Sequence, residues 1–230
     1  EVLRIQMDNL KARLILNQAA STDPIKQQQA FDNLLCFTRP QNFTYRLESL
    51  IALAQQEFEN NPAARLPLLW FFSWVAIALN GSYELKLNLH RRRHGIEVLS
   101  KKDTHNAFTA VITLLEKFQN TSSESVTEFF QQEKKRYELI MQGKSLLAHL
   151  AQTRLDFSSL TNYVTSWSEF GRNCNLRKLR KYTQIIGVDY GLGVFEARVL
   201  WGADLVMMNP TLARFALRDS EYLKELILQL

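Results

Sequence analysis

An uninterrupted apolar run at residues 66–79 constrains the fold more than any other part of the sequence. It has no charged residue and includes Trp70, Phe71, Trp74 and Val75, so a helix built from it has almost no polar face. Such a helix is stable in water only when other elements surround it. The run is also shorter than the roughly 20 apolar residues that span a bilayer. It therefore predicts the central helix of an α-helical bundle, and we expect no membrane segment.

Apolar residues recur at helical spacing on both sides of this run. The spacing predicts helices over residues 2–19, 25–37, 43–59, 105–118, 124–150 and 157–170, the range 124–150 forming one helix or two joined at Gly143. In the first helix, the predicted inward stripe consists of Leu3, Met7, Leu10, Leu14 and Ile15. Helices in this number form either a bundle or a stacked helical array.

The composition supports a mainly helical protein with a substantial core. Of the 230 residues, 46% are hydrophobic, whereas only eight are glycine and five are proline. The net charge of +5 permits an acidic partner but is also what an ordinary soluble surface carries. Cys36 and Cys174 show no metal-ligand spacing and no signal peptide is evident, so we expect reduced thiols in a cytoplasmic protein.

The C-terminal part of the sequence has a different pattern of apolar residues from the helical part. Two short apolar runs, 184–188 and 203–208, flank a helical pattern at 194–201. This order predicts two parallel strands joined by a helix. Ligands bind at the carboxyl ends of parallel strands, where Asp189 and Asn209 fall. The basic connection that precedes the first run marks a boundary between a helical domain, 1–171, and a tail, 172–230.

Residues 203–212, Ala-Asp-Leu-Val-Met-Met-Asn-Pro-Thr-Leu, resemble the second-strand motif of the transaldolase and fructose-6-phosphate aldolase family. Residues 188–191, Val-Asp-Tyr-Gly, are similar to that family's first strand, and residues 219–226 to the helix that follows the Asn-Pro strand. The resemblance covers only the C-terminal fifth of the chain. It implies a β-α-β-α unit like the start of a (β/α)8 (TIM) barrel, following the helices.

The resemblance also implies a chemistry. Family members transfer or cleave a dihydroxyacetone unit of sugar phosphates through a lysine imine (Schiff base), without metal or cofactor. Asp189 would be the acid/base, and Asn209 and Thr211 would bind substrate. The sequence departs from the family at Met207-Met208, and the imine lysine belongs to a fourth strand that this chain does not contain. We therefore expect this chain alone to be inactive. The alternative for Asp189 and Asn209 is an ordinary role in turns.

Two basic clusters are candidate sites for phosphate or nucleic acid, because guanidinium groups match phosphate oxygens. They comprise Arg91, Arg92 and Arg93 between His90 and His94, and Arg172, Arg177, Lys178, Arg180 and Lys181. A solvated helix face or an interdomain role explains the same residues. The two histidines have helical metal spacing, but no third ligand is evident and the intervening arginines repel cations. We expect no metal site and no cofactor.

Two functions remain open from the sequence. The first is the N-terminal portion of a transaldolase-like transferase of carbohydrate metabolism, with a sugar phosphate as substrate where the full barrel is present. The second is a helical interaction module that binds a protein, or nucleic acid through the basic clusters. Two strands expose their edges, so we expect a second copy of the chain or a missing C-terminal domain to cover the tail.

Overall fold

The computed structural model describes residues 2–82, 99–139, 146–173, 187–189 and 205–207, with side chains for residues 9–80, 99–139 and 149–173. In chain order the elements are α1 (Val2–Ala19), α2 (Pro24–Leu35), α3 (Pro40–Asn60), the short 3-10 helix η1 (Pro62–Ala64), α4 (Arg65–Ile77), the π-helical turn η2 (Ala78–Ser82), α6 (Lys101–Thr121), α7 (Ser123–Leu139), α8 (Leu146–Thr153), α9 (Leu160–Asn173), β1 (Gly187–Asp189) and β2 (Leu205–Met207).

Local sequence fixes several helix starts. The carboxylate of Asp23 accepts a hydrogen bond from the backbone N–H of Ile25, and Pro24 occupies the first helical position of α2. The hydroxyl oxygen of Ser100 accepts a hydrogen bond from the backbone N–H of Asp103 at the start of α6. Each side chain satisfies a backbone donor that has no partner within its own helix, which stabilises a helix by about 1 kcal/mol.

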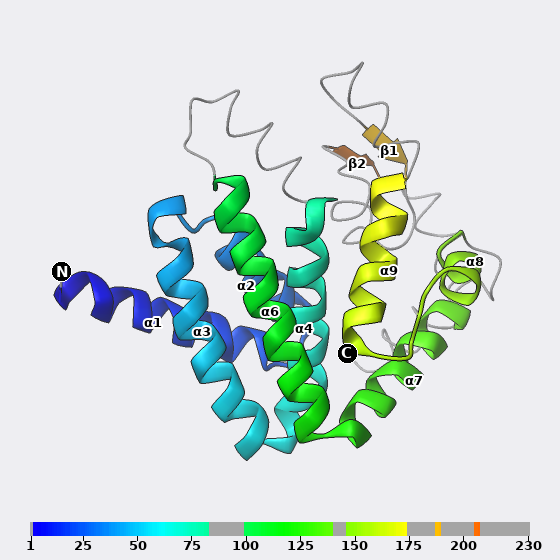
Figure 1. Cartoon of the computed structure of the whole chain (residues 1–230), viewed down its shortest axis with the longest axis horizontal. Coiled ribbons are helices and arrows are strands. Elements are labelled where there is room, and N and C mark those ends of the chain that lie inside the picture. Colours follow the sequence, from blue (N-terminus) through cyan, green and yellow to red (C-terminus); the bar gives the residue numbers. More distant parts are fainter. Residues whose placement is uncertain (1, 83–98, 140–145, 174–186, 190–204, 208–230) are drawn as a thin grey trace.

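Helix α4 is the centre of the bundle, as the apolar run predicts. It packs against α6, α7 and α9, which surround it in Figure 1. All its residues from Pro67 to Ile77 are buried except Trp70, which is half-buried. Aromatic rings tie it to its neighbours: the ring centroids of Trp74 and Trp167 lie 5.7 Å apart, and those of Phe72 and Phe118 lie 6.0 Å apart. Burying each large apolar side chain contributes about 1.5–3 kcal/mol.

By length and composition, one helical stretch in the described part of the chain is able to cross a membrane. It runs from Pro62 to Asn80 and has a mean hydropathy of 1.5. Within the fold, however, 72% of it is buried by the surrounding helices. That burial is typical of the core helix of a bundle.

The first helix, α1, is apolar on two opposite faces. Ala12, Ile15, Leu16 and Ala19 are buried on the side that packs against α2 and α3. Leu10 and Leu14, predicted to point inward together with Ile15, are instead 67% and 55% exposed. The prediction was wrong for these two leucines because small buried alanines let α1 lie close to its neighbours on the other face. The side chains of Leu3 and Met7 lie outside the described residues.

The predicted β-α-β-α start of a barrel is also wrong. The described residues are mainly helical, and their strand content is limited to β1 and β2, three residues each. These two strands pair in parallel, with Gly187 opposite Leu205 and Asp189 opposite Met207. As far as they are described, two paired strands of three residues each do not form the start of a barrel. The helix expected at 194–201 lies outside the described residues, and the division at residue 171 stays a prediction.

Candidate functional site

Most residues that the sequence singles out for chemistry lie outside the described part of the chain. Asp189 is the last residue of β1, but its side chain is not described, and Asn209 and Thr211 come after the end of β2. Outside the described residues also lie Arg91, Arg92, Arg93, Arg177, Lys178, Arg180 and Lys181. The sugar-phosphate and nucleic-acid roles of these residues stay predictions. Among the residues that are described, no three His, Cys, Asp or Glu side chains gather as a metal site.

Exposed large apolar side chains are confined to one end of the described structure. They are Leu10, Leu14, Ile25, Phe37 and Tyr45, all on or next to α1, α2 and α3. The described residues from α4 to α9 contribute none. Single exposed apolar residues are normal on protein surfaces, but exposed apolar residues that share one face of a helix mark a candidate interaction surface.

The outer face of α1, which we define by Leu10, Lys11, Arg13 and Leu14, is the most regular part of this surface. Leu10 and Leu14 are four residues apart and therefore lie one above the other along the helix. Lys11 and Arg13 are both exposed. Successive residues are about 100° apart around the helix axis. Lys11 therefore lies roughly 60° from Leu14 on one side of the stripe, and Arg13 lies roughly 60° from Leu10 on the other side. The result is an apolar stripe with a basic side chain along each edge.

Phe37 is another exposed apolar residue of this region, 74% exposed and just beyond the C-terminal end of α2. Helix α2 packs against α1. The side-chain amide of Asn33 donates to Gln18 Oε1 at 3.0 Å, and that of Gln18 donates to Gln29 Oε1 at 3.3 Å. These hydrogen bonds join the two helices.

A buried carboxylate joins α7 to α9. Glu133 Oε2 accepts hydrogen bonds from the hydroxyl of Tyr163 at 2.8 Å and from that of Tyr137 at 3.2 Å. The Arg136 guanidinium contacts both carboxylate oxygens at 3.2 Å. Burial, and then the negative charge of Glu133, raise the pKa of Tyr163 well above its usual value. Since both carboxylate oxygens have donors, the cluster serves to fix α9 on α7.

Sequence patterns predicted no role for Glu133. It is one of several acidic residues on α7, and their spacing indicates no paired-carboxylate chemistry. The available signal was local: Arg136 and Tyr137 follow at three and four residues, on the same helix face. The decisive partner, Tyr163, is 30 residues away in sequence and belongs to another helix.

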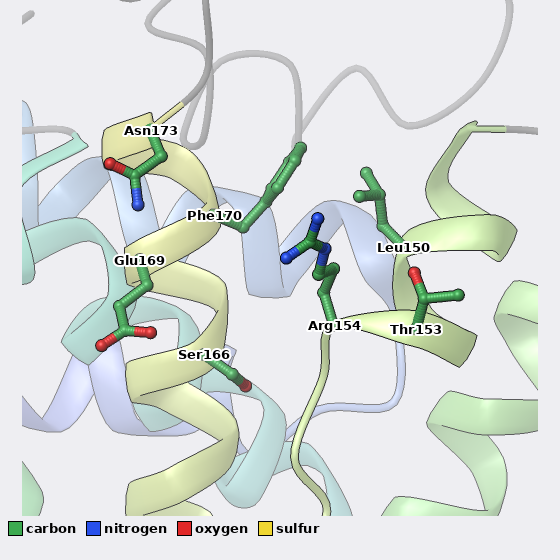
Figure 2. Close-up of a pocket in the computed structure, with 7 residues that line it drawn as sticks. All are labelled: Leu150, Thr153, Arg154, Ser166, Glu169, Phe170 and Asn173. Atoms are coloured by element: carbon green, nitrogen blue, oxygen red, sulfur yellow. The ribbon is translucent and has the colours of Figure 1, made fainter.

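A cavity of about 540 Å³ lies between α8 and α9 (Figure 2). Leu150, Thr153 and Arg154 line it from the C-terminal end of α8, and Ser166, Glu169, Phe170 and Asn173 line it from one face of α9. The cavity exists because α8 packs on α7, whereas α9 packs on α4 and α6. In Figure 2, the Arg154 side chain extends between Phe170 and Leu150, and Glu169 lies on the far side of α9.

No family model matches the chain, and no curated protein or solved structure is significantly similar to it.

Proposed function

We propose that this chain is a helical interaction module that binds an acidic amphipathic helix of a partner protein on the outer face of α1. The observation that supports this most is the position of Leu10 and Leu14, which are exposed on the side of α1 opposite its buried face. A helix that is apolar on one face packs into its own fold. A helix that is apolar on two opposite faces has a second face for a partner.

The charges beside the leucine stripe indicate which charges the partner helix carries. Lys11 and Arg13 border the leucines on both sides, so a helix that lies along the stripe meets positive charge at each edge. Acidic residues flanking an apolar stripe on the partner complement this arrangement, as e and g positions do in coiled coils. A second copy of α1 would bring these same basic residues to both sides of the contact. The sequence continues the apolar spacing of three and four residues with Met7 and Leu3.

The proposal is testable with two designed helical peptides that share one leucine stripe, flanked by glutamates in the first and by lysines in the second. Fluorescence anisotropy at low salt should show the full chain binding the glutamate peptide more tightly. Replacing both Leu10 and Leu14 with Asp should raise the Kd at least about tenfold, because the apolar contact is lost.

Ile25→Asp is the matched control. Ile25 is exposed to a similar degree but lies at the first turn of α2, away from the outer face of α1, so this change should leave the Kd unaltered. Equal binding of the two peptides contradicts the proposal, as does binding that survives the Leu10 and Leu14 substitutions. Sedimentation of the chain alone provides a second check, since a dimer that the Leu10 and Leu14 substitutions dissociate would identify a second copy as the partner instead.

A further inference from the structure

The cavity between α8 and α9 has the size of a small-molecule site. Ligand pockets commonly enclose about 300–1,000 Å³, with apolar walls and a few polar groups that fix the ligand's orientation. Here Leu150 and Phe170 supply apolar surface, and small polar residues such as Ser166 leave the space between the helices open. The interaction surface on α1 uses none of these residues.

Hydrogen bonding within the cavity wall leaves the Arg154 guanidinium as the charged donor for a ligand. The hydroxyl of Ser166 already donates to the backbone oxygen of Tyr163 at 2.9 Å, and that of Thr153 donates to the backbone oxygen of His149 at 2.8 Å. Their protons are therefore committed to the backbone. The guanidinium of Arg154 has a fixed fork of N–H donors that matches a carboxylate in two hydrogen bonds.

Charge selects an anion as the ligand group. Arg154 extends between Phe170 and Leu150, whereas Glu169 lies on the far side of α9 (Figure 2). A positive charge in this position attracts an anion. The apolar surface of Leu150 and Phe170 next to Arg154 requires an apolar body joined to the anionic group (Figure 2).

We propose that this cavity binds a small monocarboxylate with an apolar body, the carboxylate on Arg154 and the apolar body against Phe170 and Leu150. This site is independent of the proposed docking of a helix on α1. A compound of this size reaches a Kd on the order of 1 mM through such contacts.

The experiment titrates the full chain with 3-phenylpropionate and with the uncharged 3-phenylpropanamide, and follows binding by ligand-observed NMR. The acid should bind at least about tenfold more tightly than the amide, because only the acid forms a charge-assisted pair with Arg154. Arg154→Gln should weaken binding of the acid by a similar factor. Glu169→Gln should leave the Kd within about twofold, because Glu169 lies on the far side of α9.

Arg39→Gln is the matched control, since Arg39 is an exposed arginine at the start of α3 that does not line the cavity. This change should leave the Kd within about twofold of the original value. Arg154 and Glu169 are exposed, so their substitution should not unfold the chain, and misfolding would not explain a loss of ligand binding. Circular dichroism verifies the helices of each variant. Equal binding of acid and amide overturns the proposal, as does binding that Arg154→Gln leaves unchanged or the absence of binding by the acid.

Discussion

Tyr163 of α9 donates a hydrogen bond of 2.8 Å from its hydroxyl to the carboxylate of Glu133 on α7, and both side chains are buried. This contact joins two helices that also enclose one side of the central helix α4. A buried carboxylate is stable only when donors surround it. The bundle is therefore sensitive to the loss of any of these donors.

Tyr163→Phe should lower the free energy of unfolding by about 1–3 kcal/mol, because it leaves the Glu133 carboxylate with one donor fewer in a buried site. Urea denaturation measures this change. Thr44→Val is the control at an exposed hydroxyl of α3, and it should change the stability by less than about 0.5 kcal/mol. Equal effects of the two substitutions would show that the Glu133 contact contributes nothing.

The raised pKa of Tyr163 predicts a loss of stability at alkaline pH. Below the ordinary tyrosine pKa, about 10, the hydroxyl is protonated in both states and contributes no pH dependence. Above it, the unfolded chain loses the proton whereas the folded chain keeps it, so the stability falls as the pH rises. Urea midpoints measured from about pH 9 to 11 should therefore fall more steeply for the wild-type chain than for Tyr163→Phe. Parallel slopes would contradict the raised pKa.

Glu133→Ala should cost more stability than the same change at Glu128, one of the exposed acids of the same helix. The loss of Glu133 leaves Arg136 and two buried hydroxyl groups without their acceptor, at a cost of about 2–4 kcal/mol. Glu128 accepts a surface hydrogen bond from Gln132, so its removal should cost less than about 0.5 kcal/mol. Thermal unfolding followed by circular dichroism distinguishes the two, and similar melting temperatures would refute the structural role of Glu133.

Substitutions on the buried and the exposed face of α1 should differ in their effect on stability. Ile15→Ala removes a buried side chain and should lower the free energy of unfolding by about 2–5 kcal/mol. Leu14→Ala, on the adjacent residue, removes an exposed side chain and should change the stability by less than about 0.5 kcal/mol. Denaturant unfolding of both variants provides the comparison. A large loss for Leu14→Ala would place the outer face of α1 inside the fold.

Periodicity and composition predicted the helices and the central position of residues 66–79, because a helix without a polar face is stable in water only when other helices surround it. They did not predict which face of α1 is buried. Ala12 and Ala19 are fully buried although they are small, and two leucines are exposed. Close approach of helices, rather than side-chain size, decides that orientation, and it depends on the shape of α2 and α3.

The remaining differences come from contacts between residues far apart in sequence. Glu133 gains its role from Tyr163, and the α8–α9 cavity arises from how two helices pack on different neighbours, which no local pattern encodes. In the tail, runs of Ile, Leu and Val correctly indicated a parallel pair of strands. They did not indicate that these strands are only three residues long, and the barrel expected from them is absent from the described residues.

Reversing the charge at Lys11 and Arg13 tests whether the outer face of α1 binds an acidic helix. Anisotropy titrations compare the full chain with the Lys11→Glu/Arg13→Glu variant, using the glutamate-flanked and lysine-flanked leucine peptides. If the outer face of α1 binds an acidic helix, the wild-type chain prefers the glutamate peptide and the variant prefers the lysine peptide, each by about tenfold at low salt. A preference that the two substitutions leave unchanged would contradict the account.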